Sequence, residues 1–289
     1  MGRVTTPVPP SPPDPAVSDP TPRDRATGTP CPAPDRRSAL RAGAGFVVGA
    51  IATACSPGPT VVHPSFPTPT ADGLSAGSGI HAPAPRALPG QPDQISHGPR
   101  DRPRVALTFH GQGDPSIATA ILDTAEHAGA RITVLAVGTW LDEHPDITRR
   151  ILKGGHDLGN HTQRHLDINT MSEADARAEI QKCADRLRRL TGSIGTWFRP
   201  SRARRATPLV SRLARDVGYP HVLSYDVDSL DHTSPGAPAV THKVADDVRN
   251  GSVVSLHFGY PDTVVALPAI LHALDRRGLS AVTTTELLS

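Results

Sequence analysis

The sequence is poor in cysteine, has almost no excess of charge of either sign and has no long apolar run. Three cysteines in 289 residues, Cys31, Cys55 and Cys183, are too few for a disulfide scaffold or an all-cysteine zinc site. The 30 lysine and arginine residues against 28 acidic residues give a net charge of +2, unlike the basic excess of a dedicated nucleic-acid-binding domain. No apolar run reaches the roughly 18 residues of a membrane-spanning helix, which excludes a polytopic membrane protein.

Proline is abundant instead, and it is unevenly distributed. The first 100 residues contain 21 of the 31 prolines, and the last 189 contain 10. Because proline at short intervals interrupts helices and sheets, the first third is not expected to form a packed domain. The last 189 residues are long enough to bury one core. We therefore predict a disordered, proline-rich extension over residues 1–34, a linker over 56–100 and a folded domain over 101–289.

Residues 35–55 have the order of an export signal. The pair Arg36-Arg37 precedes an uncharged stretch over residues 42–54, which is followed by Cys55. This order is typical of a secretory signal, and the arginine pair favours the twin-arginine route. The signal ends either in an ordinary cleavage site at residues 52–54 or in a lipobox with Cys55 lipidated. The Ser-Pro-Gly-Pro segment after Cys55 favours the second, so we expect a protein lipid-anchored to the extracellular face of a bacterial membrane, or else secreted.

From residue 104 onward, strand-like and helix-like segments alternate. Apolar and β-branched runs predict strands over residues 104–109, 131–137, 196–198, 221–225, 253–258 and 280–283. Apolar periodicity and end signals predict helices over 115–128, 146–153, 172–190, 208–217, 238–249 and 268–277. Such alternation implies right-handed βαβ units and a parallel sheet. The domain is shorter than the about 250 residues of a full eight-fold barrel, so the expected fold is an α/β, distorted, incomplete (β/α) barrel of about seven parallel strands.

Polar side chains gather where the predicted strands end, and in such barrels the chemistry lies at the carboxyl ends of the strands. His161 and His165 are four residues apart, so on a helical turn both imidazoles would face the same way. Two histidines on one face match the ligand spacing of a zinc-type ion. Asp114 lies in a loop with Gly111 and Gly113 that can turn sharply, and it would add a carboxylate to the pair.

Five short motifs follow one another along residues 104–289, namely Thr108-Phe109, His161-Thr162-x-x-His165, Phe198-Arg199-Pro200, Asp228-Ser229-Leu230-Asp231 and Leu256-His257. Their order resembles that of the polysaccharide deacetylases, the NodB-homology family of carbohydrate esterases. Members of this family remove N- or O-acetyl groups from chitin-like, peptidoglycan or xylan polymers with a bound divalent metal. Their fold is a distorted, incomplete barrel, in agreement with the strand count.

The resemblance implies roles for individual residues. His161 and His165 would be ligands of the divalent metal, for which zinc is expected. His257 would be the general acid that protonates the leaving amine, and Asp231 would hold His257 and favour its charged form. Arg199 would orient the base, and Leu256 would line the pocket for the acetyl methyl group. Arg202 would offer its backbone N–H to the oxyanion.

The first motif departs from the family pattern. The family has Thr-Phe-Asp-Asp-Gly, with the base and then a metal ligand, whereas this chain has His110-Gly111-Gln112 after Thr108-Phe109. Two arrangements could replace the lost carboxylates. In the preferred one, Asp114 binds the metal and His110 is the base; in the other, His110 is the third ligand and Asp114 is the base. His232 also takes the place of the family's usual tryptophan.

The sequence therefore predicts a monomeric, metal-dependent hydrolase that removes acetyl groups from an amino-sugar polysaccharide, peptidoglycan-like or chitin-like, at the bacterial cell surface. Its partner would be the acetylated polymer, and it would not bind nucleic acid. It would contact the membrane only through a lipid anchor at Cys55. Two alternatives stay open. One is a degenerate member that binds glycan or metal without turnover, because both carboxylates of the first motif are missing. The other is a metal hydrolase of a small amide or imide.

Overall fold

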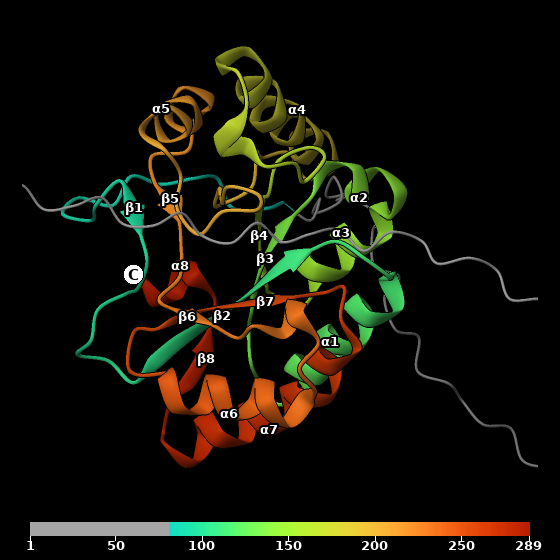
Figure 1. Ribbon diagram of the computed structural model, residues 1–289, viewed down its shortest axis with the longest axis vertical. Coiled ribbons are helices and arrows are strands. Elements are labelled where there is room, and N and C mark those ends of the chain that lie inside the picture. The colour runs from blue at the N-terminus through green and yellow to red at the C-terminus, as the bar shows by residue number, and fades with distance from the viewer. Residues whose placement is uncertain (1–80) are drawn as a thin grey trace, which may run out of the picture. The chain divides into compact units, whose positions relative to one another are not determined.

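The computed structural model describes residues 81–289, so the predicted extension and export signal, Cys55 included, lie outside the described residues. Every pair of named strands is parallel, and one sheet has the order β4-β3-β2-β7-β6, with β8 beside the start of β2. A second pair, β1 and β5, is linked to β4 through bridges at Phe198. The strands are β1 (Gln94–Ile95), β2 (Arg104–Gly111), β3 (Thr133–Ala136), β4 (Asp157–Asn160), β5 (Val222–Leu223), β6 (Val227–Asp228), β7 (Val253–His257) and β8 (Ser280–Val282). The sheet does not close, which confirms the predicted incomplete barrel (Figure 1).

Helices separate the strands, largely as the sequence predicted. They are α1 (Pro115–His127), α2 (Gly138–Glu143), α3 (Pro145–Lys153), α4 (Glu173–Thr191), α5 (Pro208–Val217), α6 (Ala237–Asp247), α7 (Pro261–Arg276) and α8 (Thr284–Leu287), with short 3₁₀ turns η1 (Ile168–Thr170) and η2 (Asp231–Thr233). The hydroxyl of Ser172 caps α4 by accepting a hydrogen bond from the Asp175 N–H. Gly192, with φ of 76°, ends that helix in the left-handed conformation that glycine adopts without strain.

Three expectations need correction. The last long helix starts at Pro261, so Pro268 lies inside α7 rather than at its beginning. Residues 196–198 form single bridges at Phe198 instead of a strand. The packed domain also begins before residue 101, because β1 pairs with β5 and the side chain of Ile95 is fully buried.

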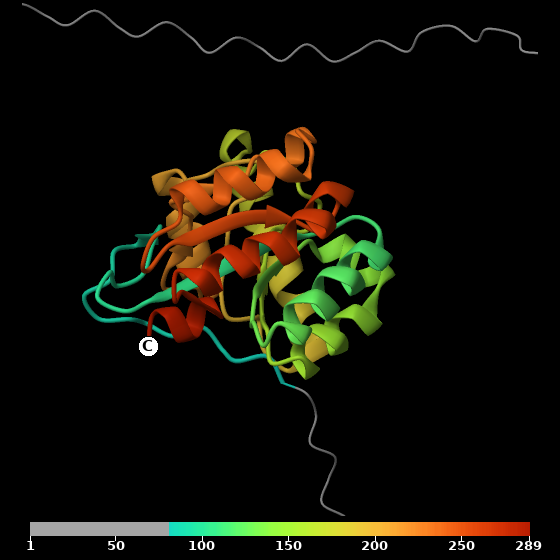
Figure 2. The ribbon, with the colours of Figure 1, turned by 90° about the horizontal axis from the view of Figure 1, so that it is seen from below.

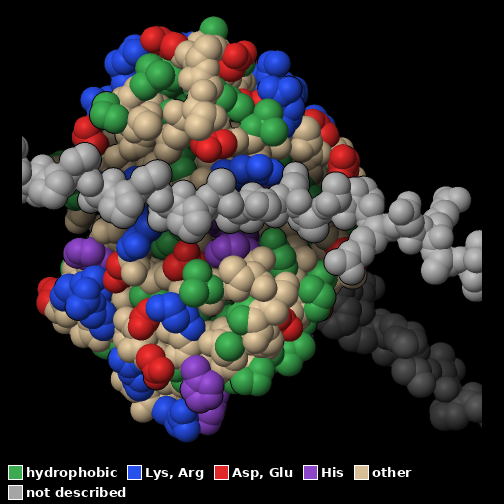
Figure 3. Space-filling model, in the orientation of Figure 1, with side chains coloured by type: hydrophobic (Ala, Val, Ile, Leu, Met, Phe, Trp, Pro, Cys, Tyr) green, Lys and Arg blue, Asp and Glu red, His purple; other side chains and the backbone are tan. Residues whose placement is uncertain are grey.

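Helices pack against the sheet in two groups. In the first group, α7 contacts both α1 and α6. In the second group, α4 contacts α5 (Figures 1 and 2). The largest apolar cluster joins β2, β3 and β7 to α1, α6 and α7, with Leu107, Phe109 and Leu256 fully buried. Each such side chain stabilises the fold by about 1.5–3 kcal/mol. On the face shown in Figure 3, basic and acidic side chains are interspersed, as the small net charge predicts.

The register of the central strands positions the candidate site. His110 on β2 pairs with His257 on β7, at the carboxyl ends of both strands. Asp228 on β6 pairs with Ser255 on β7 at the same end. Within residues 81–289, no helix has the length and apolarity needed to cross a membrane.

Candidate active site

Five imidazole rings form a continuous row at the carboxyl ends of the strands. The ring of His161 lies 4.9 Å from that of His165 and 4.3 Å from that of His110, measured between centroids. The ring of His110 lies 4.3 Å from that of His257, and the ring of His257 lies 5.3 Å from that of His232. β2, β7, the turn after β4 and η2 thus all contribute histidines to one place.

The turn that carries His161 and His165 is not the helical turn that we predicted. It follows β4 as a loop in which Thr162 and His165 have φ of 67° and 56°, values that side chains other than glycine rarely adopt. The buried Asn160 holds this turn, because its Oδ1 accepts a hydrogen bond from the Thr162 N–H and its Nδ2 donates to the Ile180 carbonyl. The two imidazoles still meet, through a strained loop of the kind that occurs at functional sites.

His110, His161 and His165 form a group that could hold a metal ion. One ligand atom from each of the three lies within 4.8 Å of the others. The Nδ1 of His161 donates to the Arg199 carbonyl at 3.0 Å, so its Nε2 is left with a free lone pair, and this buried atom has no hydrogen-bond partner among the described residues. A buried, unpartnered acceptor is costly unless something binds it. Three neutral imidazoles, one of which offers this unpartnered nitrogen, form a ligand set that fits a zinc-type ion.

Burial keeps these three histidines in the form that binds metals. It lowers the pKa of His110 and of His161 well below the usual value, and neighbouring histidines add to the effect. Burial also lowers the pKa of His165 to about 4, with a contribution from the positive charge of Arg202. All three imidazoles are therefore neutral at neutral pH, as metal ligation requires.

Asp114, the predicted third ligand, is not brought to this group. Its carboxylate caps α1 by accepting a hydrogen bond from the Ser116 N–H at 2.8 Å, and hydrogen bonding with the side chain and the backbone of Ser116 lowers the pKa of Asp114. Its side chain is exposed, and it does not contribute to the ligand atoms that meet at His161. Of the two arrangements open from the sequence, the geometry favours the one in which His110 is the third ligand.

The position after His110 leaves no room for the family's second aspartate. A Cβ atom built on Gly111 would lie 2.9 Å from Cγ1 of Val134 and 3.1 Å from Cα of Ala136. Val134 and Ala136 belong to β3, which pairs directly with this part of β2. The loss of the carboxylate is thus accompanied by close packing of the neighbouring strand.

Arg199, predicted to orient the base, is fully buried beside the histidines. Its Nε donates to the Leu223 carbonyl at 3.2 Å and its Nη2 to the Ser224 carbonyl at 3.0 Å. Its Nη1 has no hydrogen-bond partner among residues 81–289, and burial lowers the pKa of this guanidinium to about 10. The side chain therefore anchors the β5 end of the site and keeps one donor free.

Asp231 and His257 form a tightly bonded pair. Oδ1 of Asp231 lies 2.7 Å from Nδ1 of His257, and Oδ2 accepts hydrogen bonds from the His257 N–H at 2.8 Å and the Thr263 hydroxyl at 2.6 Å. Burial opposes ionisation of Asp231, but the bonds from His257 and Thr263 outweigh it and lower the pKa of Asp231. Asp231 is therefore a carboxylate that holds the proton on Nδ1 and leaves Nε2 of His257 available for proton transfer.

The pocket between these elements has a volume of about 520 Å³. Its walls are mostly imidazole, arginine and tyrosine side chains, among them His110, His165, His232, His257, Arg202, Arg204, Tyr225 and Tyr260. Leu256, predicted to line it, is instead buried in the main core. Two hydroxyls that sequence reasoning missed complete the site, namely Thr263 on Asp231 and Ser255, whose Oγ lies 3.3 Å from Nε2 of His110. Only the strand register could have indicated Ser255, and no spacing pattern marks Thr263.

Comparisons with known proteins agree with this geometry. The pattern of the polysaccharide deacetylase family matches residues 97–222. A peptidoglycan-N-acetylglucosamine deacetylase of Bacillus cereus is 30% identical over 202 residues, which is 66% of this chain and 90% of that protein. The chain belongs to the polysaccharide deacetylase family.

Solved structures of the family have the same fold as this family member. A peptidoglycan N-acetylglucosamine deacetylase superposes with a TM-score of 0.64 at 26% identity, over 68% of this chain and 92% of that chain. A family pseudoenzyme from Bacillus anthracis superposes with a TM-score of 0.65 at 23% identity, over 69% and 70% of the two chains, a similarity that concerns the fold alone. The family and the fold that the motifs suggested are therefore confirmed.

Proposed function

We propose that this family member is a metal-dependent hydrolase that removes acetyl groups from an amino-sugar polysaccharide of the peptidoglycan or chitin type. The observation that carries the proposal is the position of the Asp231–His257 pair beside the group of His110, His161 and His165, at a pocket that His110, His165 and His257 line. Both the metal-binding group and the proton carrier that amide hydrolysis needs are present. The named activity of the Bacillus cereus relative supports the same substrate class.

The ligands of the metal would be His110, His161 and His165, and zinc is the ion that such a set of neutral nitrogens favours. A divalent cation there would polarise the acetyl carbonyl and make the attacking water more acidic. The Arg199 carbonyl fixes the tautomer of His161, and the Ser255 hydroxyl contacts Nε2 of His110, so both rings are oriented before any ligand arrives.

Proton transfer falls to His257. Its Nε2 takes a proton from the attacking water and then passes a proton to the nitrogen of the breaking carbon–nitrogen bond, releasing acetate and an amine. Asp231 stays ionised and stabilises the imidazolium between the two transfers. Asp114 is not needed for this role, and its carboxylate is engaged at the start of α1. Arg202 lines the pocket, and its backbone N–H is proposed to meet the oxyanion.

The test is acetate release by the purified protein from N-acetylglucosamine oligomers and from peptidoglycan, together with its metal content. Wild type is expected to release acetate, and chelation followed by zinc is expected to remove and restore the activity. His257→Gln, which keeps a polar side chain of similar length, should retain the metal and lose turnover by on the order of 10²–10⁴-fold. Metal retention without acetate release from any acetylated glycan would contradict the proposal.

The second candidate function is binding without turnover, and one observation favours it. The family's base is a carboxylate. In this chain the buried Nη1 of Arg199 donates no hydrogen bond to a carboxylate among the described residues. In that case glycan binding, followed by calorimetry, would persist in His257→Gln at the wild-type affinity. Acetate release that depends on His257 would exclude this alternative.

Export and surface attachment are also part of the proposal, supported by the peptidoglycan substrate named for the Bacillus cereus relative. If Cys55 carries a lipid, Cys55→Ala should shift the protein from the membrane fraction to the medium. Equal distribution of wild type and variant would instead indicate an ordinary cleavage site.

A further inference from the structure

Two histidines of this chain stand where the motif pattern has other residues, and each completes a set of three ligands. His110 replaces the first aspartate of the first motif and joins His161 and His165. His232 stands in the place of a tryptophan and joins Asp231 and His257. Among residues 81–289 these are the two groups of three histidine, cysteine or acidic side chains whose ligand atoms lie within 4.8 Å of one another.

We infer that Asp231, His232 and His257 form a second divalent-cation site, and that its occupancy withdraws His257 from proton transfer. One carboxylate and two imidazoles are a donor set that suits zinc and related ions. The ring of His232 lies 5.3 Å from that of His257, and His232 is exposed, so an ion can enter from the pocket that both residues line.

The hydrogen bonds of Asp231 indicate which oxygen would bind the ion. Oδ2 is held by the His257 N–H and the Thr263 hydroxyl, whereas Oδ1 has Nδ1 of His257 as its partner. A cation at Oδ1 and Nδ1 takes the place of the proton that these two atoms share. The neutral ring then carries its one proton on Nε2 instead of Nδ1, so Nε2 can no longer accept a proton from water.

The two sites would be neighbours, because the rings of His110 and His257 are 4.3 Å apart. Three neutral imidazoles hold the first ion, and the second set uses a buried carboxylate that is already engaged in hydrogen bonds. The second ion must move the proton of His257 from Nδ1 to Nε2 and break a short hydrogen bond, so we expect it to bind more weakly than the first. Activity should therefore rise with the first equivalent of metal and fall with the second.

The test is a titration of the metal-free, full-length protein with zinc, followed by calorimetry and by elemental analysis after dialysis against fixed free zinc. Wild type should bind two ions per chain in two phases. His232→Ala should bind one, in a single phase, because two of three ligands cannot compete with water. His232 is exposed, so the substitution is not expected to affect folding, which circular dichroism can verify.

Two matched variants separate the sites. His161→Ala should lose the tight phase and keep the weak one, and His272→Ala, on α7 outside both sets, should keep both phases. One ion per chain in wild type, or two in His232→Ala, would overturn the inference. Ion counting does not require turnover, so a protein that releases no acetate but binds two ions would contradict the proposed activity and leave the second site supported.

Discussion

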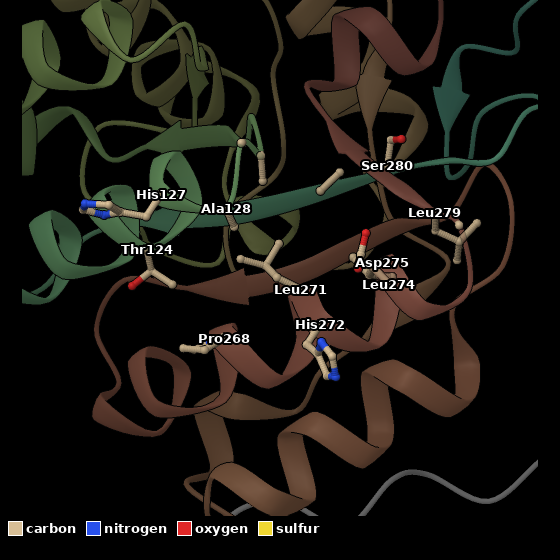
Figure 4. Close-up of a pocket in the computed structure, with 14 residues that line it drawn as sticks. Thr124, His127, Ala128, Pro268, Leu271, His272, Leu274, Asp275, Leu279 and Ser280 are labelled. Carbon is tan, nitrogen blue, oxygen red and sulfur yellow. The ribbon is translucent and has the colours of Figure 1, made fainter.

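The histidine pocket at the carboxyl ends of the strands and a second pocket at their amino ends differ in both size and chemistry. The second pocket lies between the end of α1, the end of α7 and the start of β8, and its volume is about 810 Å³ against about 520 Å³ (Figure 4). Leu271, Leu274 and Leu279 line it together with polar side chains such as Asp275 and Ser280. His127 and His272 also line it, but they lie apart from each other on α1 and α7 (Figure 4).

The comparison shows that the candidate catalytic side chains meet at the smaller of these two pockets. At the carboxyl ends, the strand register brings His110 beside His257 and the loops add further imidazoles. At the amino ends, β3 and β8 follow the ends of α1 and α7, and neither of the two candidate ligand groups found in residues 81–289 lies there. Four experiments test this difference between the two pockets.

The largest difference is expected between equivalent substitutions in the two pockets. His161→Ala should remove the tightly bound metal and abolish acetate release, because it takes away a buried ligand whose Nε2 has no other partner. His127→Ala should leave both properties unchanged. Elemental analysis and an acetate assay on the two purified variants measure this, and equal metal content in both would remove the basis for the contrast.

A smaller effect is expected when the pair beside the metal group is altered without removing a ligand from that group. Asp231→Asn keeps the size of the side chain but no longer fixes the proton on Nδ1 of His257. We expect kcat to fall by on the order of 10²–10⁴-fold, because His257 then presents the wrong tautomer or loses its stabilised charge. The tightly bound ion should remain, and its loss from Asp231→Asn would instead assign Asp231 to the first metal site.

The stability of the metal-free protein should depend on pH through the histidine pocket. The native pKa of His165 is about 4, and burial lowers those of His110 and His161 as well, whereas an unfolded histidine titrates near about 6.5. Below about pH 6.5 the unfolded chain binds more protons than the native one. The stability present at higher pH is therefore lost progressively as the pH falls toward about 4.

Urea denaturation of the metal-free protein between pH 7.5 and pH 5 measures this loss. His165→Ala should show a shallower dependence than wild type, and His272→Ala should show the wild-type dependence. Bound zinc should raise stability across this range without reducing its pH dependence, because the nitrogens that it occupies are already unprotonated in the metal-free native protein. An identical dependence in wild type and His165→Ala would show that this imidazole does not carry the effect.

Much of the fold could be predicted because long elements leave strong patterns. An apolar run predicted the strand β2, and an apolar stripe with end signals predicted the helix α4. β1, β6, α2 and α8 have between two and six residues, too few for a period to show. Pro268 misled the prediction, because proline commonly occupies the first turn of a helix, whereas α7 tolerates it internally.

The site was predictable to the extent that strand ends and spacing determine it. His161, His165, Asp231 and His257 all meet, because parallel strands deliver their carboxyl ends to one edge. The spacing of residues in the sequence could not decide whether His110 or Asp114 would be the third metal ligand. An aspartate directly before a proline at the first position of a helix is a strong capping signal, and the structure uses it in that way.

The smallest effect is expected at Asp114, and it tests this assignment directly. Asp114→Asn removes the carboxylate but keeps a side-chain oxygen that can accept the hydrogen bond from the Ser116 N–H, so α1 should remain capped. If His110 is the third ligand, the variant should match wild type in metal content, in acetate release and in thermal midpoint. His110→Ala, in contrast, should lose the tightly bound ion together with activity. Loss of the ion from Asp114→Asn and its retention in His110→Ala would restore the arrangement in which Asp114 binds the metal and His110 accepts the proton.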